Sequence, residues 1–294
     1  MHESDSVPRI WTSLGLPGIV DVHTHFMPKP VMDKVWRYFD DVGPLTGREW
    51  PIAYRTDESE RVETLRRFGV LAFTSLVYAH KPQMAAWLNQ WAAQFAAETP
   101  DCLHTATFYP EPGAADYVAT AIDGGTRVFK AHIQVGNYDP NDPLLDDVWG
   151  AIEDSRTPVV IHCGSGPVPG EFTGPEPIRT LLRRYPRLAL IVAHMGMPEY
   201  LEFLDLCERH EHVRLDTTMV FTGFSDAFMP FPRSAMQRLI GIGDRILFGS
   251  DFPNIPYGYA SAMEALTSID GVDDDWLRNV FHRNAVSLFG LAHS

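Results

Sequence analysis

The chain has 294 residues, of which 45% are hydrophobic and 21% are charged, and its formal net charge at pH 7 is −14. This composition is close to the globular average and argues against a disordered, collagen-like or coiled-coil protein. The 38 acidic side chains outnumber 24 basic ones, and the basic ones form no cluster, so a nucleic-acid partner is not expected.

Short apolar runs recur along the chain with helical patterns between them, which is typical of βα units around a parallel sheet. Runs such as residues 159–161 and 188–192 are almost continuously apolar, as expected of strands covered on both faces. The eight expected strands are residues 18–22, 70–77, 103–109, 127–131, 158–161, 188–193, 213–216 and 245–249.

Apolar residues at helical spacing predict a helix after each of these strands. The expected helices include residues 58–68, 84–95, 114–123, 144–154, 177–185, 198–209 (with Pro198 at its first position), 235–240, 259–267 and 276–289. No stretch offers the Gly-rich turn of a doubly wound nucleotide site. We therefore predict an α/β fold, a distorted (β/α)8 TIM barrel, as one domain over residues 1–294 with an N-terminal extension at 1–17.

Two long segments interrupt the alternation. Residues 26–57 follow the first strand and are rich in proline, aromatic and charged residues, so they are a candidate lid or substrate loop. Residues 164–176 form a Gly/Pro-rich loop after the fifth strand.

Cysteine usage and the first residues indicate the compartment. The three cysteines, Cys102, Cys163 and Cys207, form no CxxC pair and leave an odd count, which fits a reducing environment. The first 18 residues lack the basic and apolar regions of a secretory signal, and no apolar run approaches the roughly 20 residues that cross a bilayer. We expect a cytoplasmic protein with no membrane partner.

Side chains that can bind a metal stand at the ends of four expected strands. Because side chains alternate along a strand, His23 and His25 point to the same side. His162, His194 and Asp251 each follow another strand, at the end where barrel enzymes build their active sites. Imidazoles with a carboxylate suit zinc and also admit manganese or iron.

Four motifs in order, His23-Thr24-His25, Ile161-His162, Ala193-His194 and Gly249-Ser250-Asp251-Phe252-Pro253, resemble the amidohydrolase superfamily. The resemblance is to its amidohydrolase-2 branch, the aminocarboxymuconate semialdehyde decarboxylase-like metal-dependent hydrolases. It implies a distorted barrel with one divalent ion, most often zinc. It also implies metal ligands at His23, His25, His162 and Asp251, and a His194 that acts on substrate or on metal-bound water. Asp21 is expected to support these ligands without binding the metal itself.

These placements allow a metal-activated water to hydrolyse an ester, lactone or amide, with Asp251 accepting the proton. Two alternatives stay open. A decarboxylase of this branch uses the same ligands, although the Cys-Gly-Ser-Gly-Pro that follows His162 departs from the named decarboxylase and favours hydrolysis. A binuclear hydrolase would need a carbamylated Lys130.

The substrate is expected to be a small organic molecule that is carboxylated or aromatic. Lys130, at the end of the fourth expected strand, is either a cation for an anionic substrate or an ordinary paired lysine. Trp36, Phe252 and Tyr257 are candidates for an aromatic substrate wall, or they pack loops onto the barrel. His132 is expected to be a structural hydrogen-bonding residue. Family analogy suggests a homodimer.

Overall fold

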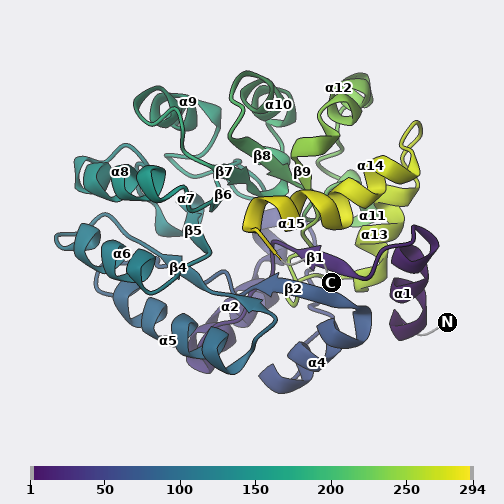
Figure 1. The fold of residues 1–294 in the computed structure, drawn as a ribbon, viewed down its shortest axis with the longest axis horizontal. Helices are drawn as coiled ribbons and strands as arrows, with labels where there is room; N and C mark the ends of the chain where they lie inside the picture. The colour runs from purple at the N-terminus through teal and green to yellow at the C-terminus, as the bar shows by residue number, and fades with distance from the viewer. Residues whose placement is uncertain (1–2, 292–294) are drawn as a thin grey trace. The chain divides into compact units, whose positions relative to one another are not determined.

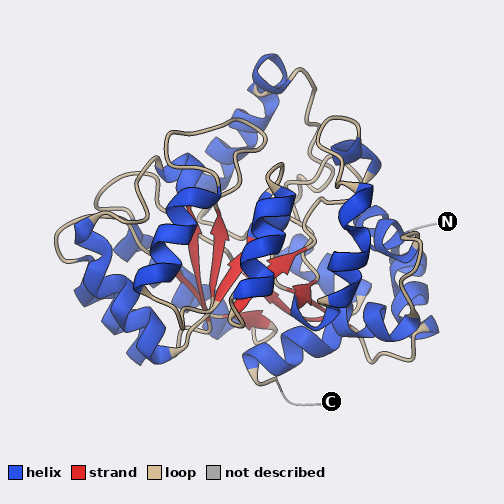
Figure 2. Cartoon of the chain, turned by 90° about the horizontal axis from the view of Figure 1, so that it is seen from above, coloured by secondary structure: helices blue, strands red, loops and turns tan. Residues whose placement is uncertain are grey.

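The structure is a computed structural model that describes residues 3–291. The chain divides into two compact units, each described here by itself: unit 1 lies within Met1–His25, Lys29–Phe73 and Asp216–Ser294, and unit 2 within Phe26–Pro28 and Thr74–Leu215. Figure 2 distinguishes the helices, strands and loops of the described residues.

Unit 1 holds the beginning and the end of the chain. Its first part contains α1 (Glu3–Ser13), β1 (Ile19–Asp21), α2 (Lys29–Asp41), α3 (Gly43–Thr46), α4 (Glu58–Phe68) and β2 (Val70–Thr74, whose last residue belongs to unit 2). Its second part contains α11 (Gly223–Asp226), α12 (Met236–Gly241), β9 (Ile246–Leu247), α13 (Tyr259–Thr267), α14 (Asp274–Arg278), a π-helical turn at Asn279–Arg283 and α15 (Asn284–Phe289) (Figure 1).

The first strand of unit 1 runs parallel to β2, with Asp21 opposite Phe73. All three residues of β1 are buried. Beyond the end of β1, the amide of Val22 donates to the carbonyl of Phe248 at 3.0 Å, so the segments that follow β1 and β9 run side by side.

Unit 2 contains five parallel strands in the order β4 (Thr105–Thr107), β5 (Val128–His132), β6 (Val159–His162), β7 (Leu190–Val192) and β8 (Val213–Asp216, whose last residue belongs to unit 1). The register places His132 opposite His162 and Ile161 opposite Val192. Its other elements are β3 (Cys102–Leu103), α5 (Ala85–Glu98), α6 (Ala114–Asp123), α7 (Ile133–Gly136), α8 (Asp146–Ser155), α9 (Pro175–Arg184) and α10 (Tyr200–Arg209).

Local sequence explains where most elements begin and end. Helix α4 has Glu58 and Glu60 in its first turn and Arg66 and Arg67 in its last, which match the helix dipole. Gly69 then ends it in the left-handed conformation, at φ 79°. Strands β6 and β7 are buried along their whole length, as their continuous apolar runs predict.

Four details differ from the sequence predictions. The expected strand 103–109 is split into β3 and β4. Pro198 is not the first residue of a helix, because α10 begins at Tyr200. The segment 26–57 is not a structureless loop, because it contains α2 and α3, and the extension 1–17 contains α1.

Helix α1 is anchored by tertiary contacts that local sequence does not reveal. The Trp11 indole donates to the carbonyl of Phe68 at 2.9 Å. The Glu3 carboxylate accepts from the Tyr54 hydroxyl at 2.5 Å and from the amide of Ala260 at 3.0 Å. These contacts stabilise a short helix that has Pro8 inside it.

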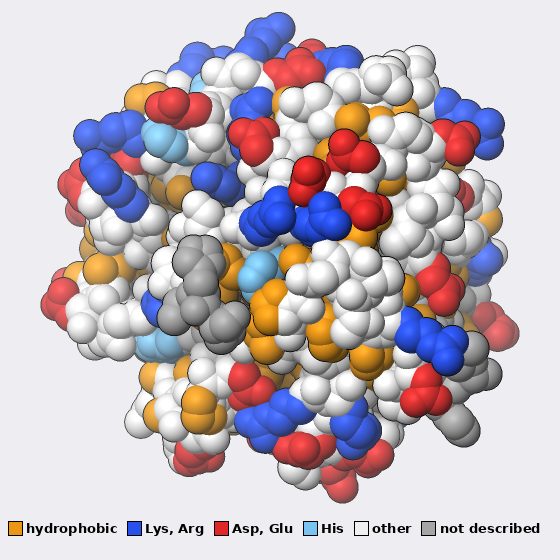
Figure 3. All heavy atoms as spheres, turned by 45° about the vertical axis from the view of Figure 1, so that its right-hand side comes forward, with side chains coloured by type: hydrophobic (Ala, Val, Ile, Leu, Met, Phe, Trp, Pro, Cys, Tyr) orange, Lys and Arg blue, Asp and Glu red, His pale blue; other side chains and the backbone are white. Residues whose placement is uncertain are grey.

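Among the helices within residues 3–291, none is both long and apolar enough to cross a bilayer. Acidic and basic side chains lie beside one another on the face drawn in Figure 3. Ion pairs also occur within unit 2, where Arg187 pairs with Glu153 at 3.1 Å and with Asp154 at 3.2 Å.

Candidate metal centre

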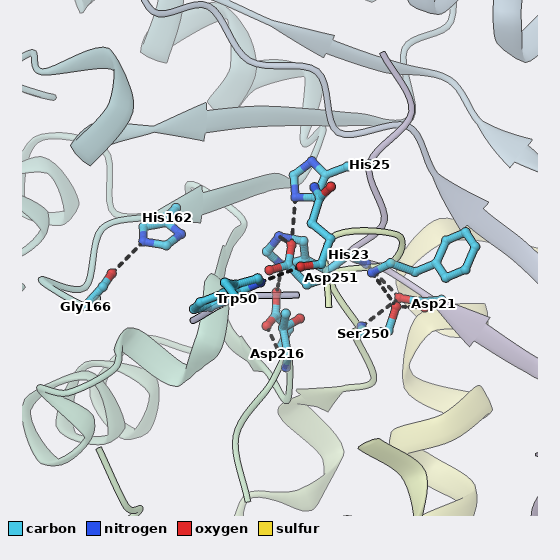
Figure 4. A network of polar contacts seen from close by, with 12 residues as sticks. Asp21, His23, His25, Trp50, His162, Gly166, Asp216, Ser250 and Asp251 are labelled. Carbon is cyan, nitrogen blue, oxygen red and sulfur yellow. Dashed lines mark hydrogen bonds and ion pairs between the residues drawn. The ribbon is translucent and has the colours of Figure 1, made fainter. Parts of the chain in front are cut away.

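Three side chains of unit 1, His23, His25 and Asp251, bring their donor atoms to one point. Each offers one ligand atom, and these atoms lie within 4.8 Å of one another. Asp251 Oδ1 is 2.9 Å from His25 Nε2 and 3.7 Å from His23 Nε2 (Figure 4). All three residues are buried, with Asp251 the most exposed at 8%.

Backbone hydrogen bonds hold the two chain segments that carry these ligands. The amide of Asp251 donates to the carbonyl of His23 at 2.8 Å, and the amide of His25 donates to the carbonyl of Phe252 at 2.7 Å. Thr24 and Phe252 form a parallel bridge between these bonds. Asp251 itself adopts a left-handed conformation with φ 74°, which is costly for a non-glycine residue and is typical of functional sites.

Gly249 makes the close approach of these segments possible. A Cβ at this position would lie 2.2 Å from Thr218 Oγ1 and 2.7 Å from His23 Cβ. Both distances are far below van der Waals contact, so only glycine fits here without moving His23.

Asp216 orients His23 and was missed by the sequence analysis. This fully buried residue places Oδ2 2.9 Å from His23 Nδ1. A carboxylate at Nδ1 fixes the tautomer, so Nδ1 carries the proton and Nε2 presents its lone pair to a cation. The signal was present in the sequence, since Asp216 ends a strand just as the predicted ligands do.

The donor set fits a divalent ion. Two ligands 2.0–2.1 Å from one ion in tetrahedral geometry are about 3.3 Å apart. The observed separations of 2.9 and 3.7 Å lie on either side of that value. Two imidazoles and one carboxylate suit zinc, manganese or iron and leave coordination positions open.

Asp21 supports this site through the backbone and not through the imidazole of His23. Its carboxylate accepts from the amides of His23 and Ser250, both at 3.1 Å, and from the hydroxyls of Ser250 at 2.6 Å and Tyr259 at 2.8 Å. Complete burial raises the pKa of the Asp21 carboxyl to about 7, although these hydrogen bonds lower it. The sequence predicts a supporting role for Asp21, but its partners Ser250 and Tyr259 are visible only in the structure.

Unit 2 contains the other predicted histidines. The ring of His162 stacks on that of His132 with centroids 4.2 Å apart, and it lies 4.8 Å from the ring of His194 in edge-on contact. His162 Nε2 is 3.1 Å from the carbonyl of Gly166 and therefore donates a proton to it. His194 has φ 55°, another left-handed non-glycine residue.

His132 accepts a hydrogen bond from the amide of Val135 at 3.3 Å and caps helix α7, in line with its expected structural role. Lys130, also in unit 2, is completely buried and lies in the middle of β5, not at its end as expected, because the strand continues to His132.

The predicted aromatic substrate residues lie in unit 1. Trp36 donates its indole N–H to Asn254 Oδ1 at 3.0 Å. Phe252 is completely buried, and its ring packs on Tyr54 and Tyr259 with centroids 4.8 and 6.2 Å apart. The ring of Tyr257 lies 6.3 Å from that of Phe224, and burial raises the pKa of its hydroxyl. Their roles in substrate binding stay predictions.

Comparison with known proteins identifies a family. The family model described as Amidohydrolase matches residues 20–291. Among curated proteins, none matches this sequence.

Solved structures show the fold. A TIM-barrel protein of uncharacterised function from Bordetella bronchiseptica is 19% identical with a TM-score of 0.74, covering 93% of this chain and 98% of its own. A 5-carboxyvanillate decarboxylase from Novosphingobium aromaticivorans, complexed with manganese and a nitrobenzoic acid, is 16% identical with a TM-score of 0.63, covering 94% and 97%. A probable 2-pyrone-4,6-dicarboxylic acid hydrolase from Acinetobacter baumannii is 15% identical with a TM-score of 0.60, covering 93% and 100%. The predicted α/β TIM-barrel fold is confirmed by these similarities.

Proposed function

The chain belongs to the amidohydrolase family, and from this premise we propose that it is a mononuclear metal-dependent hydrolase. The proposed substrate is an ester, lactone or amide of a small organic molecule that carries a carboxylate or an aromatic ring. The observation that carries the proposal is the convergence of His23, His25 and Asp251 donor atoms within 4.8 Å. Zinc is the proposed ion, with manganese or iron as alternatives.

When bound, a divalent ion lowers the pKa of its water from about 15.7 toward ~7 and polarises a substrate oxygen. The residues of the site supply the rest. His23 is held by Asp216 with its Nε2 directed toward Asp251, and the second oxygen of Asp251 can accept a proton from the attacking water. Burial of all three ligands strengthens the electrostatic interactions among them.

Three further roles belong to the proposal and rest on the sequence resemblance. They are His162 as an additional metal ligand, His194 as the residue that hydrogen-bonds the attacking or departing oxygen, and Lys130 as a cation for an anionic substrate. Because Lys130 is completely buried, a charge on it needs a buried anionic or hydrogen-bonding partner.

Decarboxylation is the second candidate function. It is favoured by one observation: a decarboxylase with bound manganese is among the proteins of similar fold. The set of two imidazoles and one carboxylate serves either reaction. A binuclear hydrolase with a carbamylated Lys130 is a further alternative.

Two measurements test the proposal. Metal analysis of freshly purified protein is expected to give about one ion per chain, because one donor triad carries the proposal. Assays on a panel of esters, lactones, including 2-pyrone-4,6-dicarboxylate, and hydroxybenzoates, with carbon dioxide trapped, are expected to give hydrolysis products. The Asp251→Asn variant should be inactive, whereas Asp270→Asn, at an exposed aspartate, should match the wild type.

Each alternative result would support a different conclusion. Carbon dioxide release without a hydrolysis product would replace the hydrolase with the decarboxylase. Two ions per chain would favour the binuclear site with Lys130. Absence of any bound metal after supplementation would refute the proposed function.

A further inference from the structure

Asn254 joins two parts of unit 1 that are far apart in the sequence. The segment 29–53 contains α2 and α3 and follows the His23/His25 motif, while Asn254 comes three residues after Asp251. We propose that Asn254 is a positioning residue that fastens the 29–53 segment to the turn carrying Asp251. This inference rests on the proposed function only in treating Asp251 as a metal ligand.

Three hydrogen bonds connect the segment with Asn254 and its neighbour. The indole of Trp36 donates to Asn254 Oδ1 at 3.0 Å, and the indole of Trp50 donates to the main-chain carbonyl of Asn254 at 2.7 Å. The amide of Ala53 donates to the carbonyl of Ile255 at 2.9 Å. One asparagine therefore accepts both indole N–H groups, one with its side chain and one with its backbone.

Burial raises the free-energy cost of breaking these hydrogen bonds. Asn254 is 3% exposed and Trp50 is 7% exposed, so water does not readily replace the acceptor of the Trp50 indole, whereas Trp36 is half-buried. Around Trp50, the rings of Phe39 and Phe224 lie with centroids 5.1 and 4.8 Å away. The guanidinium of Arg48 lies 4.4 Å from the Phe224 ring centroid and donates to the Phe224 carbonyl at 2.7 Å.

The same asparagine is tied to the metal-ligand turn. Its amide donates to the carbonyl of Asp251 at 2.8 Å, closing the turn from Asp251 to Asn254. Trp50, Asp251 and His23 are labelled in the close-up of the site (Figure 4). A cation that restrains Asp251 therefore also restrains Asn254 through this turn. Asn254 in turn restrains the 29–53 segment through the two indole hydrogen bonds.

Hydrogen–deuterium exchange on the full chain tests this role. Asn254→Leu removes the side-chain acceptor, Trp36→Phe removes the donor and keeps a ring, and Asn254→Asp keeps an oxygen in the accepting position. We expect amide exchange across α2 to rise about tenfold in Asn254→Leu and Trp36→Phe, and to stay near wild type in Asn254→Asp. The double variant should exchange no faster than either single variant, because both remove the same bond.

Controls separate this role from a general loss of stability and from the metal proposal. Exchange in α6 and α13 should not change, and Trp87→Phe, at a tryptophan that is 47% exposed, should match the wild type. Mn²⁺ binding, measured by calorimetry, should be retained in Asn254→Leu. Adding Mn²⁺ should slow α2 exchange in the wild type, and this protection should be lost in Asn254→Leu.

Unchanged α2 exchange in folded Asn254→Leu and Trp36→Phe would overturn the proposal, as would equal Mn²⁺ protection in the wild type and Asn254→Leu. If Mn²⁺ does not bind the wild type at all, the proposed function fails, and exchange without metal still decides the role of Asn254.

Discussion

The two units both gather imidazoles at strand ends, but the contacts described for those imidazoles differ between the units. In unit 1, His23 and His25 face the carboxylates of Asp216 and Asp251 at 2.9 Å. In unit 2, His162 stacks on His132 and directs Nε2 to the neutral carbonyl of Gly166. Strand-end position brings histidines together in both units, whereas carboxylates aimed at ring nitrogens make a site for a cation in unit 1.

Removing one of the side chains named above from each unit tests this difference most strongly, with His162 as the additional ligand of the proposed function. Asp251→Ala should weaken Mn²⁺ or Zn²⁺ binding at least about a hundredfold, because it removes the negative charge as well as a ligand. His162→Ala should weaken it only about tenfold, since a neutral imidazole is lost and the charged set remains. Calorimetry measures both. Equal losses in the two variants would show that charge does not distinguish the units.

The next largest loss of metal affinity is expected from a substitution at Gly249, where Thr218 and His23 lie close to the backbone. Gly249→Ala adds a methyl group 2.2 Å from Thr218 Oγ1 and 2.7 Å from His23 Cβ, so we expect a loss of about 1–3 kcal/mol of stability and most of the metal affinity. Urea unfolding and metal titration report the two effects. Gly150→Ala, in α8 with no atom within 4 Å of its Cβ, is the control and should not destabilise. Normal metal binding by Gly249→Ala would contradict the packing argument.

Much of the fold could be predicted because each signal was local. The apolar run 159–161 identifies a strand without knowledge of other segments. The His23 and His25 pair is a weak signal by itself, and it became a ligand hypothesis only together with the histidines and the aspartate at other strand ends. Helix α1 could not be predicted in this way. Pro8 lies inside it and is unfavourable in a helix, and Glu3 and Trp11 bind residues that are distant in the sequence. Its stability is tertiary in origin.

The candidate site likewise contains residues that the sequence predicts and residues that only the structure reveals. His23, His25 and Asp251 were expected from residue type and position, and the structure brings them together. Asp216 was passed over because an aspartate after a strand also caps turns, and only the 2.9 Å contact with His23 distinguishes the two roles. Asn254 acts partly through its main-chain carbonyl, and a main-chain contact cannot be predicted from the type of residue.

Asp216→Asn tests whether the carboxylate that faces His23 contributes to the metal affinity of unit 1. The substitution keeps the volume but removes the charge that holds the Nδ1 proton of His23, so metal affinity should fall about 10–100-fold. Asp270→Asn, at an exposed position, is the matched control. Stability to urea should be followed in parallel, because an affinity loss that merely tracks unfolding would remove the specific role of Asp216.

Asp21 predicts a pH dependence of stability in unit 1. Its folded-state pKa of about 7 lies above the usual 3.8, so the folded chain binds the proton more tightly than the unfolded chain. This stabilising contribution is complete below about pH 4 and is lost as pH rises to 7, at up to about 1.4 kcal/mol per pH unit. Urea unfolding in the presence of a chelator should show this slope in the wild type. The slope should be absent in Asp21→Asn, and identical slopes would contradict the assignment.

The smallest effect is expected in unit 2, at the contact between Ser165 and Glu199. The Ser165 hydroxyl and amide both donate to the Glu199 carboxylate, the amide at 3.0 Å, and so fasten the loop after β6 to the start of α10. Ser165→Ala removes one of these bonds and should cost about 1 kcal/mol of unfolding free energy. Ser268→Ala, whose hydroxyl is exposed, should cost less than about 0.5 kcal/mol. Because the Ser165 hydroxyl and amide are both directed to Glu199, we expect Mn²⁺ affinity to stay within about twofold of the wild type. A loss as large as that of Asp216→Asn would show that the loop after β6 contributes to cation binding and that the contrast between the two units is not one of charge.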